Sequence, residues 1–306
     1  MMWCGSCFAG GMARPQMQAE PKPPFPKQKL RKPGIEAHLR PQPKYQAPRY
    51  KAVGKLEKKV ALITGGDSGI GRAVALLYAR DGADVAITAL PAERRDADET
   101  RRAVEGEGRE CLVIEGDLST ARACRKAVER TVKSFGRLDI LVSNAAHQNR
   151  KKNLEQVDDA EWDRTFKTNV YAYFWLVKAA LPHLKAGASI IATGSIVGIQ
   201  GSAELPDYSA TKGAIHTLTK TLAQNLVKRG IRVNCVAPGP VWTPLNAADK
   251  GASREKVAEF GKKTPLGRPA QPEEIAPAYV FLASDADSSF ITGIVLPALG
   301  GETVGG

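Results

Sequence analysis

The sequence predicts an α/β fold: a single doubly wound domain, in which a seven-stranded, mostly parallel sheet carries helices on both faces, preceded by an extended proline-rich arm. Three observations predict this class. From about residue 56 onward, short aliphatic runs alternate with amphipathic segments of helix length. The aliphatic runs lack polar alternation, which is typical of strands buried on both faces. A glycine-rich turn follows the first run directly.

Strict alternation of strand and helix favours right-handed crossovers within one parallel sheet. The predicted strands are Val60–Thr64, Asp84–Ala89, Cys111–Glu115, Leu138–Ser143, Ala188–Thr193, Ile231–Val236 and Ile291–Leu296. The predicted helices cover residues 69–80, 93–106, 119–135, 158–181, 206–229 and 272–283. These elements fill residues 56–306 as one domain, and the pattern gives no sign of a second core.

Composition excludes several classes of protein. The chain has 306 residues, of which 43% are hydrophobic and 25% charged, so it can bury a full core and is not globally disordered. No apolar run reaches the roughly 18 residues of a membrane-spanning helix. Cys111, Cys124 and Cys235 lie in apolar or helical stretches and indicate buried free thiols of a reducing, cytoplasmic compartment. No His, Cys or Asp cluster has the spacing of a metal site.

The net charge of +12 is concentrated near the N-terminus. Residues 1–59 hold 13 Lys and Arg against 3 Asp and Glu, whereas the remainder of the chain carries a net charge of only +2. Because the globular part is nearly balanced, specific nucleic-acid binding is not expected. A basic arm still raises non-specific affinity for polyanions, so polyanion binding through the arm stays open as an alternative function.

Residues 1–55 form the predicted arm. Nine of the 20 prolines lie in residues 1–50, and proline fixes φ and lacks an N–H, so this segment cannot join a sheet interior or form a long helix. Trp3, Cys4 and Cys7 resemble a thioredoxin-type motif, but no strand precedes them to present it, which favours a disordered tail. We expect the rest of the arm to be solvated or to cross a partner subunit.

The turn after the first strand is predicted to bind the phosphates of a dinucleotide. It reads Thr-Gly-Gly-Asp-Ser-Gly-Ile-Gly and leads into a helix, whose N-terminus offers free N–H groups and the positive end of its dipole. Glycines in such a turn permit the sharp bend, the close approach of a diphosphate and close packing of the helix. The residues expected to contact the dinucleotide are Gly65, Asp67, Ser68, Gly69, Ile70 and Gly71.

Tyr208 and Lys212 are the predicted acid/base pair. They lie four residues apart in the helix 206–229 and therefore on one helix face. A free phenol has a pKa near 10 and is a poor acid or base at neutral pH. A neighbouring ammonium group and the positive nicotinamide of an oxidised cofactor would lower that pKa, so that Tyr208 can exchange a proton with a substrate oxygen.

Two further polar residues are expected near this pair. Ser195 follows the strand Ala188–Thr193, at the sheet edge where doubly wound proteins bind ligands, and its hydroxyl can donate to a carbonyl oxygen. Asn169 lies in the long, largely apolar helix 158–181, where a buried amide must find partners. A water link from Asn169 towards Lys212 would satisfy both groups.

Together these stretches resemble the short-chain dehydrogenase/reductase family over about residues 56–301, and in particular its branch of general stress proteins and glucose/ribitol dehydrogenase homologues. The resemblance implies a Rossmann-type domain and a catalytic tetrad of Asn169, Ser195, Tyr208 and Lys212. It also implies that Tyr208 and Lys212 contact the cofactor, together with Asp117, Leu118, Asn144, Ala145, Ala146, Pro238, Gly239, Val241 and Thr243. Ala146 stands where the family usually has glycine.

The form of the cofactor, NAD or NADP, is left open by the residues. No acidic residue follows the second strand to bind the ribose 2′-hydroxyl of NAD. Arg94 and Arg95 follow instead and could meet a 2′-phosphate, although they also suit the solvated first turn of a helix. Asp67 in the glycine turn argues against a 2′-phosphate.

The resemblance further implies a mobile lid over residues 239–264, with Trp242, Leu245, His147 and Gln148 lining the substrate pocket. The helix 158–181 carries an apolar stripe that first predicts core packing; in the family it also forms a subunit interface, so a homotetramer is expected. The stripe consists of Trp162, Phe166, Val170, Phe174, Val177 and Leu181.

The predicted function is that of a cytoplasmic NAD(P)-dependent oxidoreductase that interconverts an alcohol and an aldehyde or ketone, with Tyr208 as general acid/base. Its partners are a small-molecule substrate and copies of itself, with no membrane and no metal. A cofactor-occupied redox sensor or scaffold on the same fold is the second hypothesis, and polyanion binding through the arm is the third. The pattern leaves sugars, polyols, simple aldehydes and steroid-like ketones open as substrates.

Overall fold

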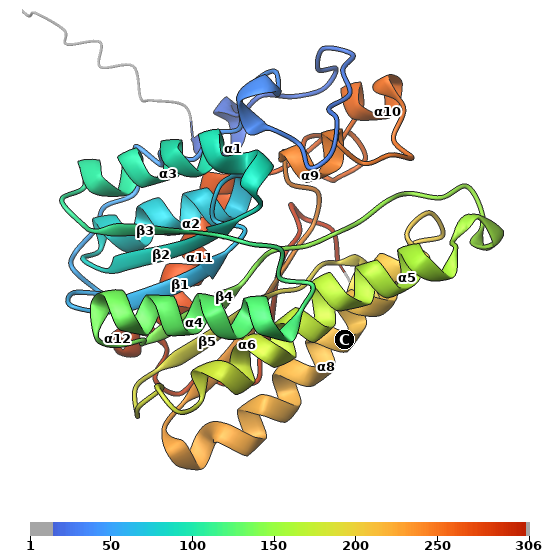
Figure 1. Cartoon of the computed structure of the whole chain (residues 1–306). Coiled ribbons are helices and arrows are strands. Elements are labelled where there is room, and N and C mark those ends of the chain that lie inside the picture. Colours follow the sequence, from blue (N-terminus) through green and yellow to red (C-terminus); the bar gives the residue numbers. More distant parts are fainter. Residues whose placement is uncertain (1–14, 304–306) are drawn as a thin grey trace, which may run out of the picture.

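The predicted α/β class is confirmed by the computed structural model, which describes residues 15–303 (Figure 1). One sheet has the strand order β3-β2-β1-β4-β5-β6-β7, and every pair of neighbouring strands is parallel. The strands are β1 (Val60–Thr64), β2 (Asp84–Ala89), β3 (Cys111–Glu115), β4 (Ile140–Ser143), β5 (Ser189–Thr193), β6 (Arg232–Pro238) and β7 (Val295–Ala298).

Helices cover both faces of the sheet, as Figure 1 shows. One face carries α2 (Gly69–Arg80), α3 (Arg94–Gly106) and α11 (Pro272–Ala283), and the other carries α4 (Ala121–Phe135), α5 (Asp159–Phe166), α6 (Ala172–Ala180) and α8 (Pro206–Leu226). Shorter helices are α1 (Gln16–Ala19), α7 (Val197–Gln200), α9 (Pro244–Ala247), α10 (Arg254–Ala258) and α12 (Asp285–Ser288). None of the helices described is long and apolar enough to cross a membrane.

The aliphatic runs form central strands because both of their faces are covered. All five residues of β1 and all seven of β6 are buried, which accounts for their unbroken hydrophobicity. One core lies between the sheet and α2, α3 and α11, and a second lies between the sheet and α4, α6 and α8. The two cores hold the strand ends rigidly, so loops at the carboxyl edge are well positioned to build a site.

Two predicted elements differ in the structure. The last strand is Val295–Ala298 rather than Ile291–Leu296, because the chain turns at Gly293, whose φ is +85°, before it pairs with β6. The helix predicted over residues 158–181 is divided into α5 and α6 by a π-helical turn, Lys167–Tyr171. Such wide turns occur often at functional sites, and this one holds Asn169.

The apolar stripe on that helix is not core packing along its whole length. Trp162 is 41% exposed and Phe174 is 48% exposed, whereas the face buried against the sheet includes Ala172, Tyr173 and Leu176. The expectation of a continuous core-facing stripe was therefore wrong at these two aromatic positions. Their side chains leave an apolar row on the outside of α5 and α6.

The described part of the arm, residues 15–55, lies against its own chain. The Phe25 ring contacts Trp242 at 4.2 Å between centroids, and the indole Nε1 of Trp242 donates to the carbonyl oxygen of Pro41 at 2.8 Å. The Phe25 amide donates to the Ala258 carbonyl oxygen at 2.8 Å. The described arm therefore lies over residues 239–264 of its own chain, the segment expected to form a lid, and is not simply solvated. Residues Trp3, Cys4 and Cys7 lie outside the described residues.

Candidate active site

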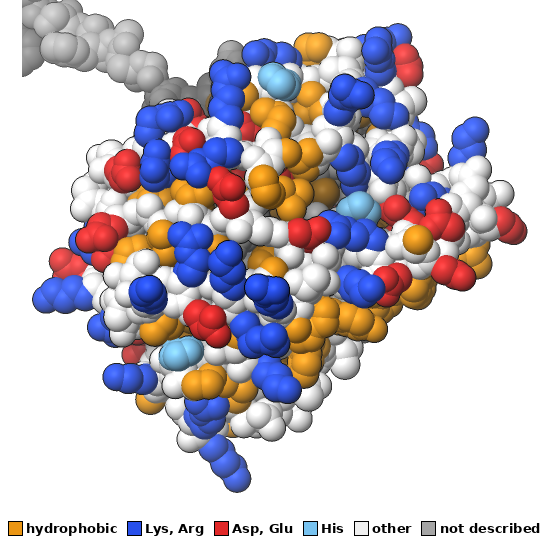
Figure 2. Space-filling model, in the orientation of Figure 1, with side chains coloured by type: hydrophobic (Ala, Val, Ile, Leu, Met, Phe, Trp, Pro, Cys, Tyr) orange, Lys and Arg blue, Asp and Glu red, His pale blue; other side chains and the backbone are white. Residues whose placement is uncertain are grey.

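A cleft of about 550 Å³ opens at the carboxyl ends of the strands. It lies where the chain crosses from β1 outward in two directions, to β2 and to β4, which is the position at which doubly wound sheets bind ligands. Loops after β1, β2, β3, β4, β5 and β6 all contribute to its lining. On the face shown in Figure 2, the cleft opens between the arm and α9 on one side and α5 on the other.

The glycine turn fits a diphosphate. A Cβ atom on Gly71 would lie 2.0 Å from the Gly65 carbonyl oxygen, so only glycine allows the turn to fold back on α2. None of the described residues accepts a hydrogen bond from the backbone amides of Ile70 and Gly71, in the first turn of α2. Free amides at a helix N-terminus are the donors that phosphate oxygens use. Gly65, Asp67, Ser68, Gly69 and Ile70 line the cleft, and Gly71 supports them from behind.

Asn144 joins three strand ends beneath the cleft. Its side-chain amide donates to the carbonyl oxygens of Thr64 and Gly65, each at 3.1 Å, and its side-chain oxygen accepts from the Thr193 hydroxyl at 3.1 Å. The Thr64 hydroxyl accepts from the amides of Asn144 and Ala145. Asn144, Ala145 and Ala146 therefore form the floor between the glycine turn and β5.

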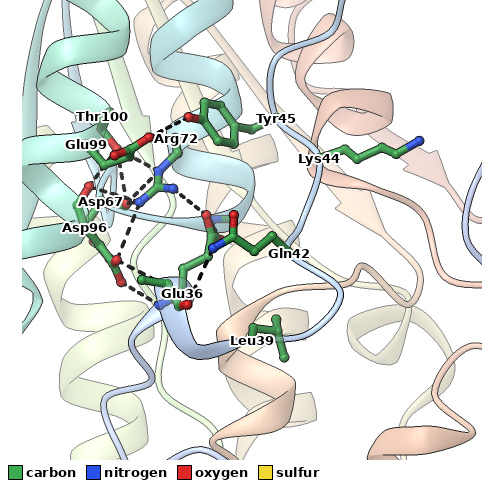
Figure 3. A network of polar contacts seen from close by, with 12 residues as sticks. Glu36, Leu39, Gln42, Lys44, Tyr45, Asp67, Arg72, Asp96, Glu99 and Thr100 are labelled. Atoms are coloured by element: carbon green, nitrogen blue, oxygen red, sulfur yellow. Dashed lines mark hydrogen bonds and ion pairs between the residues drawn. The ribbon is translucent and has the colours of Figure 1, made fainter. Parts of the chain in front are cut away.

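Arg72, one residue beyond the glycine turn, is the centre of a buried polar network (Figure 3). Its guanidinium group donates to the Asp67 carbonyl oxygen at 2.6 and 2.9 Å and to the Asp96 carbonyl oxygen at 3.0 Å. It also forms an ion pair of 2.7 Å with Glu36 of the arm, whose carboxylate accepts from the Gly69 amide at 2.7 Å. The network thus ties the arm, the glycine turn and α3 together.

The end of the cleft beside β2 is acidic. Asp67 and Glu93 both line it, and burial raises the pKa of Asp67 to about 6 and that of Glu93 to about 8. Arg94 turns away to Asp98 and Glu115, at 3.0 and 2.6 Å, and does not line the cleft.

Residues after β3 form the adjoining wall of that end. Leu118 is buried against the cleft. The Asp117 carboxylate is held by Arg164 at 2.7 Å, and the hydrogen bonds and charge of Arg164 help to lower the pKa of Asp117 against the opposing effect of desolvation.

Tyr208 and Lys212 face the cleft from α8. Both are buried, and the Lys212 ammonium lies 5.2 Å from the centre of the Tyr208 ring. Lys212 Nζ donates to the Thr193 carbonyl oxygen at 2.6 Å, which fixes it against the end of β5. The side chains are brought together by their four-residue spacing, because α8 continues unbroken through both positions.

Burial dominates the acidity of this pair. It raises the pKa of Tyr208 above its ordinary value, while the charge of Arg150 and a hydrogen bond with the Ser195 side chain act in the opposite direction. Burial lowers the pKa of Lys212 to about 8. The expected depression of the Tyr208 pKa by Lys212 is therefore not what the chain alone produces; Arg150 is the cation that favours the phenolate.

Ser195 is positioned by His216, one helical turn beyond Lys212. The Ser195 amide donates to His216 Nε2 at 3.3 Å, and burial lowers the pKa of His216 to about 4, so the ring is neutral and can accept. A Cβ atom on Gly194 would lie 2.3 Å from that nitrogen, so the glycine makes room for the ring. Ser195 thereby reaches the cleft beside Tyr208.

Asn169 holds the chain after β4. Its side-chain oxygen accepts from the His147 amide at 2.7 Å, and its side-chain nitrogen donates to the His147 carbonyl oxygen and the Thr211 hydroxyl, each at 3.0 Å. It lies behind the cleft, next to Lys212 along α8 through Thr211. This placement makes Asn169 a positioning residue for the loop after β4.

The far end of the cleft, beyond Tyr208, is polar and partly covered by the lid. Gln148 and Arg150 line it and share the buried Asp249 carboxylate, at 3.0 and 2.9 Å. Pro238, Gly239, Val241, Thr243 and Leu245 line the opposite wall after β6. His147 lines the cleft with its ring held by Glu161 at 3.0 Å. Trp242, expected in the pocket, packs instead beneath the arm, because Phe25 covers it.

Several residues of the site escape prediction from sequence. Lys32, Pro33 and Gly34 of the arm line the cleft, and no local pattern places an arm against a site whose other residues begin about 30 positions further along the chain. Arg150 and His216 act through contacts across the fold, with Tyr208 and Ser195 respectively. For His216 the sequence offers one local indication: it follows Lys212 by four residues and therefore lies on the same face of α8.

A glycine turn at a helix N-terminus, facing a buried tyrosine and lysine across one cleft, defines a dinucleotide-binding protein of the oxidoreductase class. The family model described as enoyl-(acyl carrier protein) reductase matches residues 65–303. The chain is 53% identical to general stress protein 39 of Bacillus subtilis over 274 residues, covering 90% of this chain and 94% of the relative. It is 48% identical to glucose and ribitol dehydrogenase homolog 2 of Arabidopsis thaliana over 286 residues, covering 92% and 98%. The chain belongs to the short-chain dehydrogenase/reductase family.

Solved structures agree with this assignment. A short chain dehydrogenase from Burkholderia cenocepacia in complex with NADP is 34% identical, with a TM-score of 0.75 and coverage of 81% of this chain and 98% of that one. A 3-ketoacyl-(acyl-carrier-protein) reductase from Brucella melitensis complexed with NADH is 32% identical, with a TM-score of 0.72 and coverage of 80% and 98%. The chain is an NAD(P)-dependent oxidoreductase, and its cofactor is NAD or NADP.

Proposed function

We propose that this chain interconverts an alcohol with an aldehyde or ketone, and that Tyr208 is its general acid/base. The observation that carries the proposal is the position of Tyr208: its buried side chain shares a hydrogen bond with Ser195 and faces the same cleft as the free amides of the glycine turn. The bound cofactor supplies a hydride in its reduced form or accepts one in its oxidised form. The chain must then bind the carbonyl oxygen and handle one proton.

The residues of the cleft suit these two tasks. The hydroxyls of Ser195 and Tyr208 provide two donors for one carbonyl oxygen, which stabilises the negative charge that develops on it. Because burial keeps the pKa of Tyr208 above its ordinary value, the phenol is protonated at neutral pH and can give its proton to that oxygen. In the reverse direction Tyr208 must accept the alcohol proton, and Arg150 favours the phenolate that does so.

Lys212 and Asn169 support the reacting groups. Lys212 is fixed by the Thr193 carbonyl oxygen and carries donors towards the cofactor side of the cleft, where we propose that it holds the nicotinamide ribose. Asn169 fixes the His147 backbone and Thr211, and we propose that it keeps a proton path to Lys212 open. The cofactor would be surrounded by residues from the glycine turn and from the loops after β3, β4 and β6. These are Gly65, Asp67, Ser68, Gly69, Ile70, Asp117, Leu118, Asn144, Ala145, Ala146, Pro238, Gly239, Val241 and Thr243.

We propose a small polar substrate such as a sugar or polyol. Gln148, Arg150 and Asn246 offer hydrogen-bonding groups at the far end of the cleft, beside the apolar Leu205 and Phe260. The Arabidopsis relative is named glucose and ribitol dehydrogenase homolog 2, which supports that class. The apolar row of Trp162 and Phe174 supports a homo-oligomer, which sedimentation analysis of the purified chain would test.

The test is Tyr208→Phe, assayed with both cofactors against a panel of polyols, sugars and short aldehydes. Phenylalanine fills the same space but carries no proton, so kcat should fall by about 10³-fold or more while the Kd of the cofactor stays within about threefold. The matched control is Tyr171→Phe, which removes an exposed hydroxyl on the outside of the helix that holds Asn169. Near-normal turnover of Tyr208→Phe would contradict the proposed role.

A further inference from the structure

We propose that Lys32 of the arm is an anion-binding residue of the cleft, and that its ammonium group takes a phosphate: either the diphosphate of NAD(P) or a phosphate carried by the substrate. The inference rests on the proposed use of this cleft and extends it, because it assigns part of the binding site to a segment outside the α/β domain. Four observations lead to it: where the arm is seated, what Lys32 reaches, which charges surround it, and how Lys29 differs.

The arm is seated directly on the wall of the cleft. The Leu30 amide donates to the Ala247 carbonyl oxygen at 3.0 Å, at the end of α9. At Gly34, whose φ is +106°, a Cβ atom would lie 2.9 Å from the Ala248 side chain, so the backbone lies against the lid with no room for a side chain. Lys32, Pro33 and Gly34 consequently line the cleft from the lid side.

Lys32 reaches across to the opposite wall. Its Nζ donates to the carbonyl oxygen of Gln148 at 2.5 Å, in the segment that follows β4. The lid follows β6, so this side chain connects two walls that lie on either side of β5 in the sheet. The ammonium group of Lys32 therefore lies on the lining of the cleft, between the lid and the segment after β4.

The charge of Lys32 is not neutralised by the described part of the chain. Asp249 and Glu161 are the acidic groups that influence it most, yet neither lies within 4.0 Å as an ion-pair partner in residues 15–303. The Asp249 oxygens accept from Arg150, Gln148 and Gly251, and Glu161 holds His147 and Asn149. Lys250 and Arg164 add like charges nearby.

The ammonium group therefore has unused binding capacity. It carries three donors, and one carbonyl oxygen takes only one of them. Burial lowers the pKa of Lys32 to about 8, which shows that desolvation of the charge is not fully compensated. A phosphate would supply both the opposite charge and several acceptor oxygens, and lysine is a common phosphate ligand because its charge is compact.

Lys29 of the same arm provides a matched control. Its Nζ also donates to a backbone carbonyl oxygen of the lid region, that of Lys250, at 2.8 Å. Lys29 is exposed, however, and does not line the cleft. The pair Lys32→Gln and Lys29→Gln therefore separates the charge inside the cleft from the general tethering of the arm, and glutamine keeps an N–H donor in both cases.

The experiment is calorimetric titration of the full chain and both variants with NADH at two salt concentrations. If the diphosphate is the anion, Lys32→Gln raises the Kd of NADH by about tenfold and weakens its salt dependence. Inorganic phosphate is then titrated into the protein saturated with NADH. If a substrate phosphate is the anion, Lys32→Gln leaves the NADH Kd unchanged but abolishes phosphate binding to that complex. Lys32→Arg should restore most of either effect, because it returns the charge.

Two results would overturn the proposal. One is that Lys32→Gln changes neither NADH binding nor phosphate binding to the NADH complex. The other is that Lys29→Gln changes them as much as Lys32→Gln does, which would make the arm a tether without a charge-specific role. Failure of the unmodified, folded chain to bind any cofactor is a different result, since it would contradict the proposed function of the cleft as a whole.

Discussion

Replacement of Arg72 by methionine tests the attachment of the arm to the glycine turn. Arg72 is 4% exposed and makes an ion pair of 2.7 Å with Glu36 of the arm. It also donates to the carbonyl oxygens of Asp67 and Asp96. Methionine keeps the aliphatic stem of the side chain and removes every one of these bonds. The change therefore removes the cation from a buried site that contains three carboxylates.

The expected loss of stability is large because the carboxylates stay behind. Removing one partner of a buried ion pair generally costs about 3–5 kcal/mol of unfolding free energy, since the other charge is left uncompensated. The loss of unfolding free energy is reduced in part because the residues around Glu36 can detach from the domain, so that water reaches the Glu36 carboxylate. We therefore expect a loss of about 3 kcal/mol, together with faster proteolysis within residues 20–45.

The loss should grow with pH. Burial raises the pKa of Glu36 to about 7 and that of Asp67 to about 6, although the charge of Arg72 acts to lower both. Without Arg72, both pKa values rise further in the folded state. A group whose pKa is raised by folding contributes stability at low pH and loses it as the pH rises through the folded pKa. The difference between Arg72→Met and the unmodified chain should thus be smaller near pH 5.5 than near pH 8.

The assay is urea unfolding followed by tryptophan fluorescence at both pH values, at equal protein concentration. Arg102→Met is the control, because its ion pair with Glu99 is 62% and 47% exposed at the two side chains and should contribute less than about 1 kcal/mol. An Arg72→Met variant within about 0.5 kcal/mol of the unmodified chain at pH 8, with an intact arm in proteolysis, would show that Arg72 does not hold the arm to the glycine turn.

Two further predictions concern the cofactor and the arm. NADH should bind about tenfold more tightly than NADPH, because a 2′-phosphate would face the Asp67 carboxylate with Arg94 turned away; equal Kd values in calorimetry would contradict this. Deletion of residues 1–50 should lower the Tm by about 5 °C or more, since Phe25 no longer covers Trp242; an unchanged Tm would count against that contact. Through loss of Lys32 it should also weaken binding of NADH or of inorganic phosphate to the NADH complex, and unchanged binding of both would count against the role of Lys32.

The parts of the fold that follow local patterns could be predicted from the sequence. The strand Val60–Thr64, its glycine turn and the helix Gly69–Arg80 carry periodicity and turn chemistry within one short segment. The pairing of Tyr208 with Lys212 follows from the geometry of a single helix. In each case the residues that determine the local structure lie close together in the sequence, so the sequence pattern alone predicts that structure.

The parts of the fold and of the site that depend on contacts between distant segments could not be predicted from the sequence. The family resemblance predicts Trp242 as a pocket residue, but Phe25, more than 200 residues earlier, buries it. The aromatic stripe of the helix 158–181 assumed an unbroken helix, whereas the π-helical turn at Lys167–Tyr171 interrupts it. The arm was expected to be solvated or to cross a partner subunit, because charge and proline content predict an extended segment but not the surface of its own chain that it packs against.

The proposed interconversion of an alcohol and a carbonyl compound is tested most directly by transfer of deuterium from NADH labelled at the transferred hydrogen. The chain is incubated with this cofactor and the aldehyde or ketone of the panel that it reduces fastest, and the product is analysed by mass spectrometry. We predict an alcohol with one deuterium on the former carbonyl carbon, formed by the unmodified chain and nearly absent with Tyr208→Phe. A product without deuterium, or equal labelling by Tyr208→Phe, would contradict it.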